Sequence, residues 1–209
     1  MGVEIVGQVG PQVLTDGNKA LPRLDRSAAQ IVKEVTGRFA EAAHRDELFL
    51  CSTPAAGVTV PIYSNVTQQF VLFNPLASKF KYEVLKAWAG YVSGTHVAGH
   101  LCWAYQANAQ ATEITGTAGL AVGARLSGIP KALKVFTAAT VVAFTYLRPW
   151  NYSQAVATAA SAITPWQAQD DTEGSIVIEP GQAVAIAANV AAFSVSTLAV
   201  LVRELAVAG

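Results

Sequence analysis

The stretch that decides the fold lies near the C-terminus, where residues 173–207 read EGSIVIEPGQAVAIAANVAAFSVSTLAVLVRELAV. Residues 175–179 alternate in polarity and run into Pro180-Gly181, a dipeptide that fixes one φ angle and frees the next, so the chain is expected to reverse there. The residues after this turn are apolar on both faces, and residues 193–207 are rich in β-branched side chains, as in a buried strand. The stretch therefore predicts consecutive strands that close a β-sandwich.

Part of this stretch, residues 183–202, carries no charge over a length that would suffice for a membrane helix. Its content favours strands instead. Asn189, Ser194, Ser196 and Thr197 are polar, and five valines and one isoleucine favour β-structure. On the N-terminal side of the segment, Asp170-Asp171 and Pro180-Gly181 give no positively charged flank of the kind that accompanies membrane helices. We expect β-structure here and no membrane partner.

Strand signals dominate from Glu47 to the C-terminus, and the resulting segments are separated by turn dipeptides such as Asn74-Pro75. Residues 132–144 are rich in alanine, as in a helix, but their valines and threonines favour a strand. The longest irregular piece is expected between Arg148 and Thr172. Eight to eleven strands predict a mainly β protein, a jelly-roll-like antiparallel β-sandwich. The candidate strands span residues 48–51, 58–63, 69–73, 80–92, 96–106, 111–114, 120–126, 133–147, 175–178, 182–188 and 193–207.

The N-terminal part of the chain has a different character. Residues 1–26 contain several glycines and prolines and lack periodicity, which predicts an extended arm. Residues 27–44 follow a period of 3.6, with apolar side chains on one face and charged side chains on the other, and they begin with a Ser27/Gln30 capping box. We expect an arm and one amphipathic helix over residues 1–46, used for attachment, and a sandwich domain over residues 47–209.

Charge is scarce and unevenly placed. The net charge is zero and charged residues make up 13% of the chain, about half of the usual share. Twelve of the 28 charged residues lie between Asp16 and Glu47, and only eleven lie in the 123 residues from Ala87 to Gly209. No basic stripe is present, so nucleic acid is not expected as a partner. Because interspersed charge opposes association, we expect a homo-oligomer, with a trimer first; a monomer with a Ser/Thr/Asn/Gln surface is the alternative.

The two cysteines, Cys51 and Cys102, both lie inside apolar, strand-like runs. The N-terminal residues MGVEIVGQVG have neither a positive region nor an apolar core, so no export signal is expected. Buried free thiols are the default expectation for such cysteines, and a disulfide is the alternative.

Motifs that would indicate catalysis or a metal site are weak. His96 and His100 stand four residues apart, which on a strand places them about 13 Å apart, too far to share an ion. The EPGQ turn at residues 179–182 is similar to the second box of cupins, but no histidine follows Gly181, so a cupin metal enzyme is disfavoured. No Gly-x-Ser-x-Gly motif is present. Asp170, Asp171 and Glu173 are expected in a solvated turn. We expect no enzyme, no metal and no cofactor.

Aromatic residues mark a candidate contact surface. Trp88 and Trp103 lie inside strands and are assigned to the core or an interface, whereas Trp150, Tyr152 and Trp166 flank the expected long loop. Their partner is expected to be a neighbouring subunit, with a glycan as the second possibility. The apolar face of the expected helix adds further contact candidates. These are Ile31, Val35 and Phe39.

Three segments carry a resemblance to a known class of proteins. Residues 44–95 read HRDELFLCSTPAAGVTVPIYSNVTQQFVLFNPLASKFKYEVLKAWAGYVSGT, followed later by PGQAV at residues 180–184 and STLAVLVREL at residues 196–205. Together they resemble small structural proteins of tailed bacteriophages. The resemblance covers about two thirds of the chain, and its motifs are structural.

The resemblance implies a jelly-roll-like, often trimeric virion protein that decorates a head or builds part of a tail or fibre, and it brings no catalytic residues. It implies major capsid or tail proteins as partners and a virion location after assembly in the cytoplasm of a bacterial host. The expected function is that of a non-enzymatic capsid decoration or head-associated protein that docks through its N-terminal arm. The alternative is a tail or fibre module that binds a receptor or carbohydrate.

Overall fold

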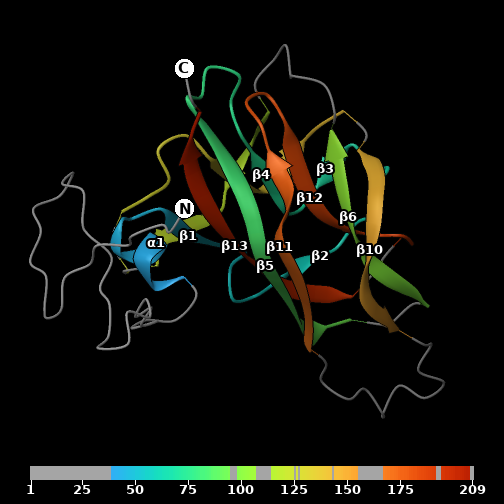
Figure 1. The fold of residues 1–209 in the computed structure, drawn as a ribbon. Coiled ribbons are helices and arrows are strands. Elements are labelled where there is room, and N and C mark those ends of the chain that lie inside the picture. The colour runs from blue at the N-terminus through green and yellow to red at the C-terminus, as the bar shows by residue number, and fades with distance from the viewer. Residues whose placement is uncertain are drawn as a thin grey trace, which may run out of the picture. The chain divides into compact units, whose positions relative to one another are not determined.

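The computed structural model describes residues 39–94, 98–106, 114–124, 126, 128–142, 144–154, 167–191 and 194–207. Within these residues the chain is mainly β, with one short helix before the first strand (Figure 1). The elements are α1 Ala40–His44, β1 Leu48–Ser52, β2 Val58–Thr59, β3 Thr67–Gln68, β4 Val71–Phe73, β5 Phe80–Ser93, β6 Gly99–Gln106, β7 Thr115–Ala118, β8 Leu120–Gly123, β9 Lys134–Thr140, β10 Thr145–Gln154, β11 Gln167–Ile178, β12 Ala183–Ala188 and β13 Val195–Ala206.

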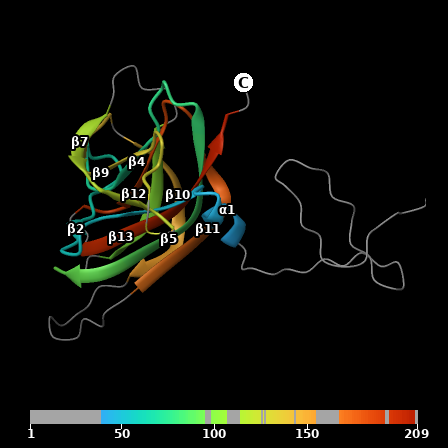
Figure 2. The ribbon, with the colours of Figure 1, turned by 90° about the vertical axis from the view of Figure 1, so that its left-hand side faces the viewer.

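Two antiparallel sheets form a sandwich-like arrangement within the second of the chain's two units, residues 41–209. Sheet 1 has the strand order β11-β5-β13-β1-β8, with β2 paired to β13. Sheet 2 has the order β10-β6-β12-β4-β9-β3, and β7 lies beside β9 (Figure 2). The predicted mainly β sandwich is therefore confirmed.

The main strand pairs are nested along the chain. β1 pairs with β13, β4 with β12, β5 with β11 and β6 with β10, all antiparallel. Strands that are far apart in sequence are thus neighbours in space, while strands close in sequence, such as β4 and β5, belong to different sheets. Each sheet is built from both halves of the sandwich domain.

The turn predicted at Pro180-Gly181 joins β11 to β12 and is fixed by Asn74. Gly181 has a φ of 83°, which a residue with a side chain rarely adopts. Its N–H donates to the Asn74 carbonyl at 2.7 Å, and the Asn74 side-chain amide donates to the carbonyls of Phe80 and Ile178 at 2.8 and 3.1 Å. Two turns that the sequence marks independently therefore hold one another in place.

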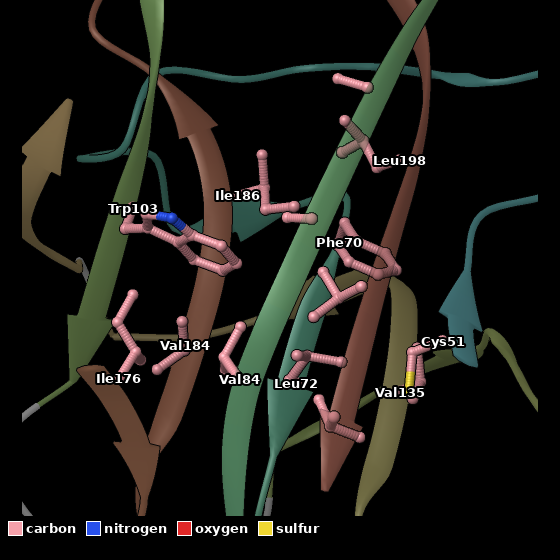
Figure 3. Packing of buried hydrophobic residues seen from close by; sticks show 14 of the residues in the cluster. Cys51, Phe70, Leu72, Val84, Trp103, Val135, Ile176, Val184, Ile186 and Leu198 are labelled. Atoms are coloured by element: carbon pink, nitrogen blue, oxygen red, sulfur yellow. The ribbon is translucent and has the colours of Figure 1, made fainter. Parts of the chain in front are cut away.

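The core lies between the sheets and follows the alternation of each strand. On β13, Leu198, Val200 and Val202 point inward, and on β12 Val184 and Ile186 do the same. Figure 3 shows Trp103, Leu198 and Phe70 among the side chains that meet in this layer. The predicted closing strands, residues 182–188 and 193–207, match β12 and β13, except that residues 192 and 193 lie outside the described residues.

A second apolar cluster covers the outer face of sheet 2. β12 is buried on both faces, because its alternate residues Ala183, Ala185 and Ala187 belong to this second cluster. These three alanines pack against side chains from neighbouring strands of sheet 2 and from segments outside the strands. Its other buried members are Val71, Phe73, Cys102, Ala104, Ile114, Phe136, Ala139, Val141 and Phe144.

The prediction of an irregular segment from Arg148 to Thr172 was wrong for the described residues of that segment. β10 continues to Gln154, and β11 begins at Gln167. The inward-facing positions of β11 include the polar residues Asp170 and Thr172, each 3% exposed. Because these two polar residues occupy core positions, the alternation of β11 could not be recognised by hydrophobicity.

The helix expected over residues 27–44 is described only at its end, where α1 spans Ala40–His44. Residues 1–38, and with them the arm, lie outside the described residues. The strand expected over residues 111–114 also falls there, except for Ile114, which is buried but not in a strand. The preference for a strand over a helix in residues 132–144 is confirmed by β9, Lys134–Thr140, but the single strand expected over residues 133–147 was wrong, because β9 ends at Thr140 and β10 begins at Thr145.

Candidate functional site

An ion pair between a half-buried arginine and a buried aspartate joins the two sheets where β10 and β11 meet. The Arg148 guanidinium donates to both oxygens of Asp170, from Nη1 to Oδ1 at 3.2 Å and from Nη2 to Oδ2 at 2.7 Å. The Trp103 indole N–H also donates to Asp170 Oδ2, at 2.6 Å. Asp170 is therefore a paired, hydrogen-bonded carboxylate in the core, as a buried charge requires. The expectation of a solvated turn at this residue was wrong.

Trp150 belongs to the same cluster and is not at the surface. It is 3% exposed, and its ring centroid lies 5.8 Å from that of Trp103. Its indole nitrogen has no hydrogen-bond partner among the described residues. Trp150 therefore cannot form the expected contact surface, because its side chain is buried in the core. These contacts hold the two sheets together, and Asp170 is bonded to both Arg148 and Trp103. We call the four residues the clamp: Trp103, Arg148, Trp150 and Asp170.

The other contact candidates are placed only in part. Tyr152 lies in β10, but its side chain is outside the described residues, as are Trp166, Ile31 and Val35 altogether. Phe39 is half-buried. The structure brings none of these candidates to the Arg148–Asp170 pair within its described residues, so the aromatic surface and the apolar helix face remain predictions.

A second buried carboxylate was missed by sequence reasoning. Glu204 is 4% exposed and accepts hydrogen bonds from the Tyr82 hydroxyl and the Lys131 backbone N–H, both at 2.8 Å. Burial, followed by the Glu204 hydrogen bond, raises the pKa of Tyr82. The Tyr82 hydroxyl in turn accepts from the N–H groups of Ala132 and Leu133. This cluster fixes the segment before β9 to sheet 1. The inward alternation of β13 was the signal that could have indicated it.

The two cysteines are free and buried, as predicted. Cys51 lies in the core between the sheets, and Cys102 lies in the cluster on the outer face of sheet 2. Burial raises the pKa of each thiol to about 12. Both thiols therefore stay protonated at neutral pH, which suits a packing role and not a nucleophile.

Of the two histidines four residues apart, His96 lies outside the described residues. His100 is half-buried, with its Nε2 3.3 Å from the Tyr146 hydroxyl oxygen. Within the described part of the chain, no group of three or more His, Cys, Asp or Glu side chains is arranged to hold a metal ion.

The outer face of sheet 1 carries a row of apolar side chains. In the register of the sheet, Val122, Leu50 and Leu201 lie side by side on β8, β1 and β13 and face away from the core. We call these three residues the Leu50 row. Leu50 is 42% exposed, although it lies on an interior strand of the sheet. Among the described residues, this row is left partly open to solvent.

The neighbouring row on the same face contains a half-buried tryptophan. Leu120, Ser52, Ala199, Trp88 and Gln169 follow one another across the strands in register. Beside this row lies a hollow with room for about 250 Å³, whose lining includes Ser52, Trp88, Gly90, Gln167 and Thr197. Here an aromatic ring and uncharged polar side chains share one concave surface. We call it the Trp88 hollow.

In the part of the chain that the structure describes, no helix has the length and apolar character needed to cross a membrane. Comparisons with known proteins add no relative to these observations: no family model, no curated protein and no solved structure gives a significant match to the chain.

Proposed function

We propose that the chain is a non-enzymatic structural protein of a tailed-bacteriophage virion, a capsid decoration or head-associated component that assembles as a homo-oligomer, with a trimer as the first expectation. The observation that carries this proposal is the Leu50 row. An apolar stripe on the interior strands of a sheet favours association when nothing covers it. The chain's scarcity of charge on its C-terminal part acts in the same direction.

The sandwich is proposed to be a jelly roll. The nested pairs support this, because a jelly roll is a long antiparallel ribbon whose first strand pairs with its last and whose inner strands pair in the same order. With β1, β4, β5, β6, β10, β11, β12 and β13 as its eight strands, the pairs β1–β13, β4–β12, β5–β11 and β6–β10 follow that rule. In this assignment β7, β8 and β9 are an insertion between β6 and β10 that widens both sheets.

The virion assignment draws on the resemblance of residues 44–95, 180–184 and 196–205 to phage structural proteins. In this proposal the arm of residues 1–26 docks on a neighbouring capsid or tail protein, and the helix expected over residues 27–44 links the arm to β1. The role of the sandwich is to present its sheet 1 face to sister subunits. Association would be stabilised by roughly 25 cal/mol for each Å² of apolar surface buried, before the cost of lost freedom is subtracted.

The oligomer is tested by Leu50→Glu, which places a charge in the Leu50 row. We expect the variant to remain folded, because Leu50 is 42% exposed, and to elute as a monomer while the unmodified chain elutes as an oligomer. Val66→Glu is the matched control, since Val66 is also an exposed aliphatic residue, 56% exposed, and lies before β3 of sheet 2. Light scattering coupled to size-exclusion chromatography measures the mass. A monomeric unmodified chain would overturn the proposal.

The docking role of the arm is tested separately. Deletion of residues 2–26 should leave the number of subunits in the oligomer unchanged and abolish its incorporation into particles, measured by co-sedimentation with the assembled virion. Normal incorporation of the truncated chain would remove the arm from the proposal.

One observation favours the alternative of a receptor- or carbohydrate-binding module. It is the Trp88 hollow, which offers an aromatic surface for stacking and polar groups for hydrogen bonds. The aromatic residues expected for that role were Trp150, Tyr152 and Trp166.

A further inference from the structure

The Trp88 hollow is formed by a glycine placed among larger residues on the outer face of sheet 1. Gly90 lies in register with Gln167 on β11 and with Thr197 on β13. Without a side chain at Gly90, the surface sinks between these two residues and Trp88, which is two positions earlier on β5. A Cβ atom at Gly90 would come within 3.0 Å of Thr197 Oγ1. The hollow therefore depends on glycine at this position.

The polar groups around the hollow are uncharged and largely unengaged. The Gln167 amide and the Ser52 hydroxyl make no side-chain hydrogen bond within the part of the chain that the structure describes. The Thr197 hydroxyl donates to the Gly90 carbonyl at 3.3 Å, which leaves its oxygen lone pairs available. The lining thus offers both donors and acceptors, and it offers them without a net charge.

Two charged side chains close to Trp88, Lys86 and Asp171, are engaged with each other. Lys86 Nζ lies 3.0 Å from Asp171 Oδ1 and 6.0 Å from the centroid of the Trp88 ring. Neither residue lines the hollow. An anionic or cationic ligand would therefore find no counter-charge of its own there, so the chemistry of the hollow selects a neutral ligand.

We propose that the Trp88 hollow binds one ring of a neutral glycan. A pyranose ring has an apolar face of C–H groups, which suits the half-exposed face of an indole, and a rim of hydroxyls that both donate and accept hydrogen bonds. Trp88 supplies the stacking surface, and Gln167, Thr197 and Ser52 bind the hydroxyls. A purely apolar side chain from a second subunit would leave these polar groups without partners, which is unfavourable.

This site is independent of the assembly role proposed above, because the Leu50 row and the hollow occupy different positions on the sheet. Leu50 pairs with Leu201, and Leu201 pairs with Lys86 on β5, whereas the hollow lies over Gly90, four residues further along β5. An oligomer that buries the Leu50 row can leave Gly90 open. One face can then serve both a subunit contact and a ligand.

The experiment is saturation-transfer NMR on the full chain with a mixture of the neutral methyl glycosides of glucose, galactose, mannose and N-acetylglucosamine. We expect signals from at least one glycoside, with a dissociation constant on the order of 1 mM for a single ring. Gly90→Val, which fills the hollow, and Trp88→Ala should abolish them. An unmodified chain that gives no signal with any glycoside would overturn the proposal.

A matched pair of variants guards against loss of fold. Gln167→Ala should weaken binding about 3- to 10-fold, because one hydrogen-bonding side chain is lost. Gln169→Ala should leave binding unchanged, since Gln169 is the same residue type on the same face of β11 but does not line the hollow. Equal effects of the two substitutions would overturn the assignment.

The Leu50→Glu variant separates this site from the subunit contact. Binding that is equal in Leu50→Glu and in the unmodified chain supports a ligand site outside the contact. Binding that appears only in Leu50→Glu would assign the hollow to the subunit contact and overturn the proposal. A failure of glycoside binding leaves the measured oligomer mass, and with it the assembly role, unaffected.

Discussion

The outer faces of the two sheets both carry apolar residues, but these residues are buried to different extents. On sheet 2, Ala185 is 1% exposed and Phe73 is 1% exposed, because both belong to a second apolar cluster that includes Val141 and Phe144 from outside the strands. On sheet 1, Leu50 is 42% exposed at an interior position. The comparison shows that an apolar residue on the outer face of a sheet is not buried merely because it is apolar. What differs, among the described residues, is that segments outside the strands cover sheet 2 and leave Leu50 on sheet 1 partly exposed.

The largest effect is expected where the chain covers its own sheet. Phe73→Ala removes a fully buried ring from the outer face of sheet 2 and should lower the free energy of unfolding by about 3–5 kcal/mol. Leu201→Ala, from the Leu50 row, should cost about 1 kcal/mol in the dissociated chain. Equilibrium urea unfolding of both variants in the Leu50→Glu background measures the difference. Equal losses would mean that the two faces are covered alike.

The clamp at the edge of the sandwich should give the next largest effect. Asp170→Asn keeps the shape of the side chain but removes the charge that Arg148 and Trp103 engage, at an expected cost of about 1.5–3 kcal/mol. Asp171→Asn is the matched control on the next residue of β11. Its side chain is 49% exposed, and its pair with Lys86 should contribute about 1 kcal/mol or less. Thermal unfolding by circular dichroism checks both, and a control as costly as Asp170→Asn would argue against the clamp.

The same substitution on each face gives the smallest but most direct test. Ala185→Leu adds volume beneath the cover of sheet 2 and should destabilise the chain by about 1–3 kcal/mol. Ala199→Leu adds the same volume to the half-buried outer face of sheet 1 and should change stability by about 0.5 kcal/mol or less. The urea concentrations at the unfolding midpoints of the two variants measure this difference in stability. A larger cost at Ala199 would show that this face is already packed.

The sandwich itself could be predicted from the sequence because its main signals are local. The Pro180-Gly181 turn, the alternation of β5 and the β-branched residues of β13 each follow from short-range preferences. β11 escaped prediction because Asp170 and Thr172 occupy inward positions, and only partners from other strands make a buried carboxylate tolerable there. No local pattern reports the presence of Arg148 and Trp103 beside it.

The candidate site was harder to predict than the fold. Trp150 and Trp88 are both tryptophans in strands, yet the first is buried in the clamp and the second lies half-buried on an outer face. Their roles depend on register, which sets what stands opposite each ring. The hollow also needs a glycine in register with Gln167 and Thr197, a coincidence of three strands that cannot be recognised in a linear sequence.

The pairing of β1 with β13 has a consequence for the order of events in the cell. Leu48 lies opposite Arg203, so the first strand of sheet 1 finds this partner only after residue 203 has been synthesised. Such long-range pairing folds slowly compared with local structure. Leu50 and Leu201, which form the proposed contact, come from these two strands. The proposed contact surface can therefore form only after Leu201 has been synthesised, and a shorter polypeptide on the ribosome does not yet present it to its neighbours.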